Sequence, residues 1–367
     1  MEGRRLTDPT WERLRQWLNR KRFPTPQLAL AEFPTTGRGL MVTRLVAAGD
    51  TLVEVPAALL LTRSAAGRLW EKRYNIQWAE IQRQFQPSEQ TVLALALVLE
   101  RRMGSQSPLY PYLQVLPTDF PTVPLAHVDV VDSARDHQHW TNGNPILLTG
   151  DLMRLLEDQV KTFQQSLTTA HDLLAALTGN TLTPKEWHWG WLAVNTRCIS
   201  LRAGEGYHPP SSNLGDSLAL APLLDLLNHD CQADVTPYFD HSRQRFVIRT
   251  NQPILPGHEA FINYGPHDNV KLVCEYGFWV PGNPHDLVPL DDMLMPYFAI
   301  THVAVEVAAE GEPRAARTVR NRLQAQRLYN HWVTRCAQLL QDTGMWGDYH
   351  LTAEEVSYRT TAAMLLL

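Results

Sequence analysis

The stretch LLDLLNHDCQADV, residues 223–235, concentrates side chains that are able to perform chemistry. Its polar members include Asp225, Asn228, His229, Asp230, Cys231 and Asp234. A zinc site needs ligands that converge on a tetrahedron at about 2.0–2.3 Å, and His229 and Cys231 are too close in sequence to do so readily. A nucleophilic His–Cys pair needs direct contact and a third, orienting group. The other local interpretation is a helix end capped by Asn228 and His229, and we predict no metal site.

Aromatic side chains dominate a second candidate, AFINYGPHDNVKLVCEYGF, which ends at Phe278. The pattern predicts a strand that ends at Tyr264, a Gly-Pro turn with a polar loop, and a short apolar helix. That helix ends at Tyr276 and Gly277, so three aromatic rings bracket the loop. Read alone, these rings form either the core of a tight turn or one wall of a binding site.

The N-terminal part is predicted to combine one helix with several strands. TTGRGL (35–40) reads as a turn between short strands, whose glycines allow positive φ angles or close approach to a ligand. It lies in a β-rich segment, 28–60, in which TLVEVP (51–56) is a strand. Residues 11–22 form an amphipathic helix. One face of this helix carries Trp11, Leu14 and Leu18, and the other carries Arg13, Arg20, Lys21 and Arg22. The basic face indicates either a solvated surface or a patch for nuclear import or an anionic partner.

A mostly helical segment, 61–203, follows. TVLALALVLERR (91–102) is apolar nearly all round, which predicts a buried helix, and 150–179 forms one long amphipathic helix or two. Residues 204–217 are rich in Gly, Pro and Ser and are predicted to be a loop.

A capping-box pattern begins the last helix of this segment. Thr183 and Glu186 have the required spacing, and Pro184 takes the first helical position. The helix is predicted over 184–200, with Arg197 in its last turn. There an arginine either complements the helix dipole or faces a ligand.

Strand patterns return in RFVIRT (245–250) and EAFINY (259–264), and the chain is helical again from about 290. This order lacks the strict βαβ alternation of a doubly wound sheet. No GxGxxG motif follows a strand, so the sequence does not support a Rossmann-type nucleotide site.

Composition excludes several classes of function. The 367 residues carry 33 Lys and Arg against 38 Asp and Glu, whereas nucleic-acid binding needs a cationic surface, so we expect no nucleic-acid partner. The 4 cysteines fit neither a disulfide framework nor a structural zinc site. We find no apolar run that predicts a membrane helix and no secretory signal in MEGRRLTDPTWERL, so we predict a cytoplasmic and/or nuclear protein without a membrane partner.

Three motifs follow one another along the chain: GRGL, then DLLNH, then NYGPHDN…EYGF. Together with WLAVNTRCISLR and LAPLLDLLNH, they resemble the SET-domain protein methyltransferases. The resemblance is to the subgroup that contains Rubisco large-subunit lysine methyltransferase and actin-histidine methyltransferase, and it covers about residues 12–300. It implies an α+β fold, in which a β-rich SET domain carries a large helical insert and is followed by a C-terminal all-helical region.

The resemblance also implies domain boundaries. Residues 1–60 would contain the N-terminal helix and the first part of the SET domain, and 61–215 the insert. Residues 216–285 would complete the SET domain, and 286–367 would form a helical substrate-binding region. Relatives carry a longer helical region, so we expect this one, which ends in TTAAMLLL, to be incomplete.

S-adenosylmethionine is the cofactor that the resemblance implies, with no metal. The implied cofactor-binding residues are Thr36, Gly37, Arg38, Arg197, Asp225, Leu226, Leu227, Asn228, His229, Tyr276, Gly277 and Phe278. Tyr264 matches the catalytic tyrosine of the family. Cys231, which first suggested a metal, has no role in this assignment.

The implied activity is methyl transfer to a lysine side chain of a protein substrate, either a histone or another protein, by a monomeric enzyme. The histidine-methylating relative has an asparagine two positions after the matching arginine. This chain has Ile199 there, and an apolar residue favours lysine. Protein-histidine methylation and a cofactor-binding protein without catalysis are the alternatives.

Overall fold

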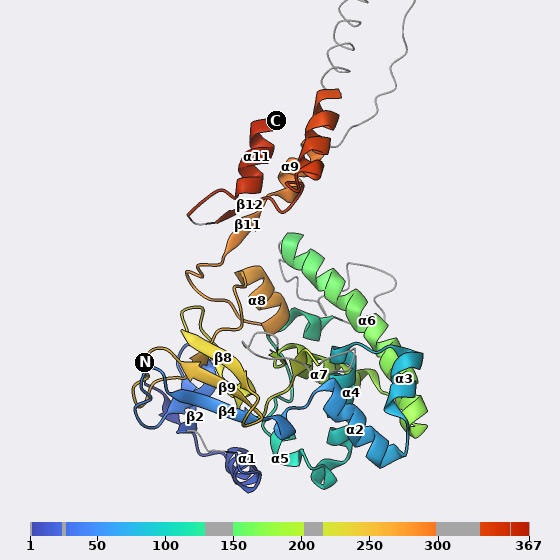
Figure 1. Cartoon of the computed structure of the whole chain (residues 1–367), viewed down its shortest axis with the longest axis vertical. Helices are drawn as coiled ribbons and strands as arrows, with labels where there is room; N and C mark the ends of the chain where they lie inside the picture. Colours follow the sequence, from blue (N-terminus) through green and yellow to red (C-terminus); the bar gives the residue numbers. More distant parts are fainter. Residues whose placement is uncertain are drawn as a thin grey trace, which may run out of the picture. The chain divides into compact units, whose positions relative to one another are not determined.

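The protein divides into two compact units. The computed structural model describes residues 2–23, 27–128, 150–201, 216–298, 331–352 and 354–366. One unit comprises Met1–Val280 and the other Pro281–Leu367, and each has its own hydrophobic core. Figure 1 shows the elements of both units along the chain.

The first sheet contains the GRG motif. Its order is β1-β2-β3, formed by β1 (Arg4–Arg5), β2 (Leu28–Phe33) and β3 (Gly37–Val42), all antiparallel. The prediction that GRGL is a turn is wrong. Residue Phe33 of β2 pairs with Gly37 of β3, so the turn occupies the preceding residues, 34–36, and GRGL runs along the strand. Gly37 has a φ of 71°, which a residue other than glycine rarely adopts as the chain leaves the turn.

A second sheet joins strands from both sides of the helical insert. Its order is β4-β9-β8, formed by β4 (Thr51–Pro56), β9 (Arg245–Thr250) and β8 (Val235–Asp240), again antiparallel. β4 and β9 are the predicted strands TLVEVP and RFVIRT, and both predictions are confirmed. Their apolar residues, such as Val53 and Phe246, lie in the main core.

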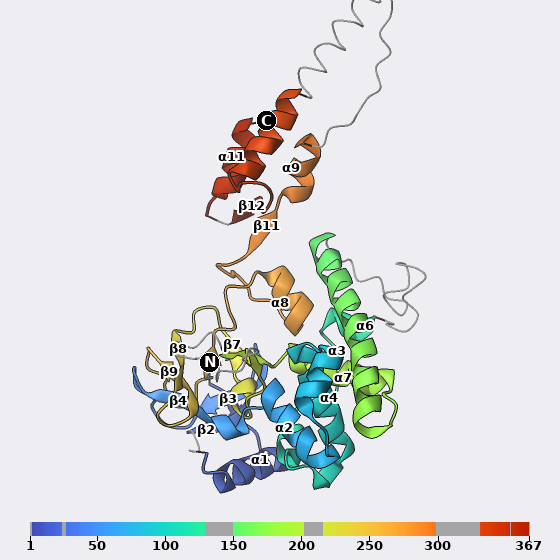
Figure 2. The same ribbon diagram turned by 45° about the vertical axis from the view of Figure 1, so that its right-hand side comes forward.

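The insert is a group of helices around α4. Its α-helices are α2 (Arg63–Tyr74), α3 (Trp78–Phe85), α4 (Glu89–Arg102), α5 (Tyr110–Leu113), α6 (Gly150–Thr178) and α7 (Pro184–Asn195). Residues 91–100 of α4 are all buried, as its apolar sequence predicts. α7 lies alongside α4 in both views (Figures 1 and 2), and Gly190 permits this approach, because a Cβ there would lie 2.8 Å from the carbonyl oxygen of Ala94.

Local signals explain where several helices begin. α1 (Pro9–Arg20) follows Asp8, whose carboxylate accepts a hydrogen bond from the backbone of Thr10, and its apolar face is buried as predicted. The capping box of α7 is present, with Thr183 and Glu186 bonded to each other's backbone. α6 is a single helix, which settles the choice left open for 150–179.

α7 ends earlier than predicted, and this moves Arg197 out of the helix. The side chain of Asn195 donates to the carbonyl of Trp191, and the hydroxyl of Thr196 donates to the carbonyl of Leu192. These bonds lie in the last turn of the helix, whose final residue is Asn195. Arg197 therefore lies in the turn that follows, ahead of β5 (Ile199–Ser200).

The stretch 223–235 is not a helix end. It forms a short 3-10 turn, η6 (Leu224–Leu226), and then β7 (Asn228–His229). β7 pairs in parallel with β10 (Phe261–Ile262), which is shorter than the strand predicted over 259–264. α8 (Asn269–Tyr276) follows as predicted and ends at Gly277.

The C-terminal unit contains strands as well as helices. It is built from β11 (Leu287–Pro289), α9 (Asp291–Phe298), a helix over 331–342, β12 (His350–Thr352) and α11 (Tyr358–Leu366). The expectation of an all-helical region is wrong here, because β11 and β12 form an antiparallel pair. The helical prediction for 320–330 and most of the predicted loop 204–217 lie outside the described residues. In the described part of the chain, no helix is long and apolar enough to cross a membrane.

Candidate functional site

A cavity of about 290 Å³ brings together residues from several distant parts of the N-terminal unit. The predicted site residues that line it are Arg38, Arg197, Asp225, Leu226, Asn228, Tyr264, Tyr276 and Phe278. They come from β3, from the turn after α7, from the η6–β7 stretch and from the region of α8. These residues share no local pattern, and the fold places them together.

The other predicted residues lie behind the lining. His229 is buried, and its Nδ1 accepts a hydrogen bond from the backbone N–H of Tyr264 at 3.1 Å. Leu227 accepts the Tyr264 hydroxyl at its carbonyl oxygen, at 2.8 Å. Thr36 donates its hydroxyl to Glu259, while Gly37 begins β3 and Gly277 ends α8. These residues position the ones that line the cavity.

One end of the cavity is charged. The Nη1 of Arg197 donates to the carbonyl oxygen of Asp225 at 2.8 Å, and the buried carboxylate of Asp225 accepts the hydroxyl of Tyr112 at 2.7 Å. Burial raises the pKa of Asp225 to about 6, although Arg197 and the Tyr112 hydrogen bond act in the opposite direction. Burial lowers the pKa of Arg38, which also interacts electrostatically with Arg197 and Asp225.

Two polar atoms in this charged part of the cavity form no hydrogen bond within the described residues. Among the described residues, the Nε of Arg197 and the Oδ1 of Asp225 are buried and have no hydrogen-bond partner. Such groups are rare in folded proteins, since each costs about 1–3 kcal/mol. An unpaired donor and an unpaired acceptor among the lining residues suit a ligand that carries both a carboxylate and an amine.

Another part of the cavity lining is aromatic. The ring centroids of Tyr264 and Tyr276 are 5.1 Å apart, and the ring of Phe278 lies 6.1 Å from that of Tyr276. Burial raises the pKa of Tyr264 to about 12, so its hydroxyl keeps its proton at neutral pH and remains a hydrogen-bond donor. The three rings can surround a flat or cationic group.

A close approach of three chain segments closes the cavity beside Asn228. The Nδ2 of Asn228 donates to Glu259 at 2.7 Å and to the carbonyl of Arg38 at 3.2 Å. A Cβ on Gly39 would lie 2.2 Å from the Glu259 carboxylate and 2.8 Å from that Nδ2. A side chain at position 39 would therefore displace the Glu259 carboxylate and the Asn228 amide, and the second glycine in GRG leaves room for their contact.

A sequence profile of the SET domain matches residues 37–265, which is more than half of the chain. The chain belongs to the SET domain family. The match begins at Gly37 and ends at Gly265, so the SET domain contains the charged end of the cavity and Tyr264. Tyr276 and Phe278 lie beyond it.

Two curated relatives and one solved structure show the extent of the similarity. SET domain-containing protein 4 of Mus musculus is 32% identical over 77% of this chain and 62% of its own length. A ribosomal lysine N-methyltransferase of Schizosaccharomyces pombe is 24% identical over 96% of this chain and 73% of its own length. A structure of Rubisco LSMT bound to AdoMet has a TM-score of 0.55 and 17% identity, covering 77% of this chain and 59% of that one. This chain thus spans less than two thirds of the mouse relative.

Several residues at the SET domain cavity were not predicted from the sequence. Gly39 and Glu259 lie within motifs that were recognised, but only the paired strands show that they touch Asn228. Tyr112, Asp119 and the residues after it come from the insert, where no motif marks them. The contact of Tyr112 with Asp225 spans 113 positions, so no local signal could have found it.

The polar residues of 223–235 do not converge on one point. Asp225 faces Tyr112, while Cys231 is half-buried and its carbonyl accepts a hydrogen bond from Asn263. In the part of the chain that the structure describes, no three His, Cys, Asp or Glu side chains are arranged to hold a metal ion.

Proposed function

We propose that the chain is an S-adenosylmethionine-dependent protein-lysine N-methyltransferase. The observation that carries this proposal is the cavity itself, whose lining combines a guanidinium and a buried carboxylate oxygen without a hydrogen-bond partner with a protonated tyrosine and two further rings. The relatives support it, since one is a ribosomal lysine N-methyltransferase and a solved neighbour is the SET domain of LSMT bound to lysine and AdoHcy.

The residues of the cavity fit the proposed cofactor. S-adenosylmethionine carries a carboxylate, an ammonium, a sulfonium and an adenine. Arg197 would hold the carboxylate by a charge-assisted hydrogen bond, using the Nε that is otherwise left over. Asn228 and Arg38 lie at the same wall, and Phe278 and Tyr276 present rings that suit the adenine and tolerate a nearby cation.

The bound cofactor would supply an electrophilic methyl group, and the chain's own residues prepare the amine that accepts it. The Tyr264 hydroxyl donates to the Leu227 carbonyl, so its oxygen lone pairs are free to accept an N–H of the amine and fix its direction. A lysine has a pKa of about 10.4, so roughly one molecule in a thousand is neutral near pH 7.4. Burial among aromatic rings lowers that pKa, because it disfavours the ammonium form.

The choice of lysine over histidine rests on this aromatic wall. Ile199 is half-buried in β5 and packs on the main core, and it does not line the cavity. Its apolar side chain therefore does not separate the two substrates directly. The ring of Tyr264 and the two rings beside it suit a long aliphatic side chain, whose amine they shield from water.

The substrate and setting are part of the same proposal. The substrate is a protein, either a histone or another protein, and the enzyme acts as a monomer. All four cysteines are free thiols, which supports a reducing compartment such as the cytoplasm or nucleus.

Labelled methyl transfer into a whole-cell extract tests the proposal, with mass spectrometry of the modified residue. We expect the label on lysine, and a loss of about 100-fold or more in Tyr264→Phe, because the amine is no longer aligned. Calorimetry should show unchanged S-adenosylmethionine binding in that variant. Tyr110→Phe, outside the cavity, serves as the control.

Three outcomes would contradict parts of this scheme. Label on histidine alone would refute the lysine substrate. Full activity in Tyr264→Phe would remove the role assigned to that hydroxyl. Cofactor binding without transfer to any protein would favour a non-catalytic interaction protein.

A further inference from the structure

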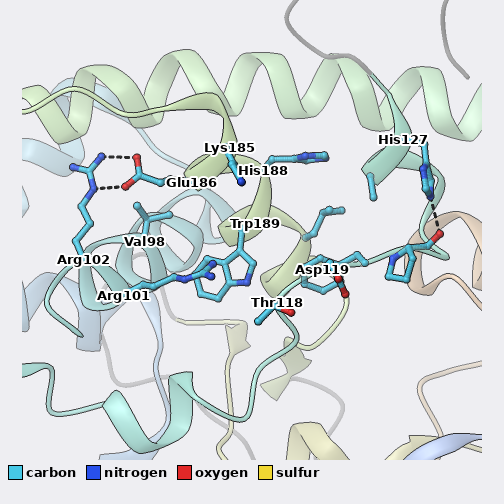
Figure 3. A pocket seen from close by; sticks show the side chains of 14 residues that line it. Val98, Arg101, Arg102, Thr118, Asp119, His127, Lys185, Glu186, His188 and Trp189 are labelled. Carbon is cyan, nitrogen blue, oxygen red and sulfur yellow. Dashed lines mark hydrogen bonds and ion pairs between the residues drawn. The ribbon is translucent and has the colours of Figure 1, made fainter. Parts of the chain in front are cut away.

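A second and larger cavity, of about 560 Å³, lies in the helical insert. It is formed by the C-terminal end of α4, the segment after α5 and the N-terminal half of α7, and Figure 3 shows its side chains. Its charged residues include Arg101, Arg102, Asp119, Lys185 and Glu186. None of the predicted cofactor-site residues lines it.

One pair of charges in this cavity is already satisfied. Arg102 donates two hydrogen bonds of 2.8 Å to the Glu186 carboxylate and a third to the carbonyl of Thr181. The hydrogen bond from Arg102 lowers the pKa of Glu186 to about 2, and the same carboxylate caps α7 through Thr183. The helix N-terminus that would attract a phosphate is therefore occupied by the protein's own carboxylate.

Two cations remain available to a ligand. The Arg101 guanidinium lies 4.0 Å from the centroid of the Trp189 ring, and Figure 3 shows the two side chains against each other. The Trp189 ring is fixed because its Nε1 donates to the carbonyl of Pro117 at 2.9 Å. Arg101 and Lys185 are exposed, and within the described residues neither forms an ion pair.

The other polar groups in the cavity leave its net charge positive. The Nε2 of His188 bonds the carbonyl of Leu125, and burial lowers the pKa of this imidazole, which favours its neutral form. The Nε2 of His127 bonds the carbonyl of Pro121 at 2.7 Å. Asp119 is the one further carboxylate among the lining residues, against two unpaired cations.

Apolar side chains line the remainder of the cavity. Val98, Phe120, Ala126 and Leu192 line it together with Trp189. An occupant must therefore combine a negative charge with an apolar or aromatic part. The exposure of both cations suits a segment of a protein surface better than a small enclosed molecule.

We propose that this cavity binds an acidic side chain of the protein substrate, next to an apolar or aromatic side chain that packs on Trp189. The identity of the partner as the substrate rests on the proposed function. The connection is structural, because Asp119, Phe120 and Pro121 line both cavities. Residues bound in the insert would thus touch the wall of the cavity that holds the target lysine and set the sequence preference around it.

Peptide binding tests the proposal without requiring catalysis. Fluorescence anisotropy would compare labelled lysine-centred peptides flanked by Glu and Phe with peptides flanked by Lys and Phe. The wild-type chain of 367 residues should bind the acidic peptides about tenfold more tightly, as expected for a hydrogen bond to a charged group. Arg101→Glu should abolish this preference, and Lys185→Glu should reduce it by about threefold.

A control variant and a second test variant keep the result interpretable. Arg83→Glu, an exposed arginine on α3, is the matched control and should retain the wild-type preference. Lys185→Glu changes an exposed side chain, so it remains a test if thermal denaturation shows that Arg101→Glu does not fold.

The outcomes separate this site from the proposed function. Equal binding of both peptides to the wild type, or an unchanged preference in both variants, overturns the site. Binding that depends on Arg101 without methyl transfer upholds the site and counts against the enzyme. Methyl transfer with no dependence on Arg101 or Lys185 upholds the enzyme and overturns the site.

Discussion

Asp225 is the residue at which burial and charge oppose each other most directly. Burial raises its pKa from 3.8 to about 6, in spite of Arg197 and the Tyr112 hydroxyl. Between these two values the folded protein holds a proton that the unfolded chain has released. The free energy of unfolding therefore falls as pH rises through this interval, by about 3 kcal/mol.

Asp225→Asn should remove this pH dependence, because an amide does not ionise. Urea denaturation at a series of pH values would show the wild type losing stability relative to the variant as pH rises from 3.8 to about 6. Asp240→Asn gives the opposite control, since the hydrogen bond from Ser242 lowers the pKa of the exposed Asp240. A constant difference between wild type and Asp225→Asn would contradict the prediction.

Tyr112→Phe should change both the stability of the protein and the pKa of the Asp225 carboxylate, because it removes a hydrogen-bond donor. The variant leaves the Oδ2 of Asp225 without its donor, which costs about 1–3 kcal/mol of stability at pH values where Asp225 is ionised. It should also raise the pKa of Asp225 further, so the fall in stability extends to higher pH. Tyr110→Phe, whose half-buried hydroxyl accepts from Gln114, is the matched control and should change stability less. Equal losses in the two variants would argue against a special role for Tyr112.

Among the elements, α8 is held in place by its terminal glycine. Gly277 has a φ of 78°, and a Cβ there would lie 2.8 Å from the backbone carbonyl carbon of Thr122 and 2.9 Å from the backbone nitrogen of Val123. Gly179, at the end of α6, has a similar φ of 71° with no atom near the same position. Replacing each glycine by alanine therefore compares a site that has backbone strain alone with a site that has both strain and steric contact.

Gly179→Ala should cost about 1 kcal/mol of stability from the left-handed backbone alone. Gly277→Ala should cost about 3 kcal/mol or more, because the segment that lines both cavities must also move. Chemical denaturation of both variants measures the difference. Similar losses would show that Thr122 and Val123 yield easily.

The elements also show which structural features can be predicted from the sequence. Local signals predict the start of α7 from Thr183 and Glu186, and the strand TLVEVP from its β-branched residues. They do not predict the end of α7, where the side chains of Asn195 and Thr196 bond to backbone carbonyls of the preceding turn. The pairing of β7 with β10 joins distant segments, so no window around Asn228 reveals that it is a strand.

The residues of the candidate site also divide into those that sequence motifs predict and those that only the fold brings to the cavity. Motif resemblance selects residues that line one cavity, such as Arg197 and Tyr264, because the motifs keep their order along the chain. It does not find Tyr112 or Asp119, which come from the insert and reach the cavity only through the packing of helices.

At the scale of the molecule, the cofactor cavity belongs to one unit. Its lining residues run from Leu30 to Phe278, inside the unit that ends at Val280. A fragment of residues 1–280 should therefore fold on its own core and bind S-adenosylmethionine within about threefold of the whole chain. Calorimetry measures this affinity.

A shorter fragment, 1–265, provides the contrast. It contains the SET domain match but lacks α8, Tyr276 and Phe278, so it should lose cofactor binding. Equal affinity in the two fragments would show that Tyr276 and Phe278 contribute nothing to cofactor binding.

The pairing of β4 with β9 has a consequence for the order of folding in time. Thr51 faces Arg249 in this sheet, with the whole insert between them, so closing the pair must overcome a large loss of chain entropy. A helical insert that condenses first shortens the effective loop, since local helices form much faster than distant strands meet. The β4-β9-β8 sheet should therefore assemble late. Phe278 must also be synthesised before a nascent chain can complete the cavity proposed for the cofactor.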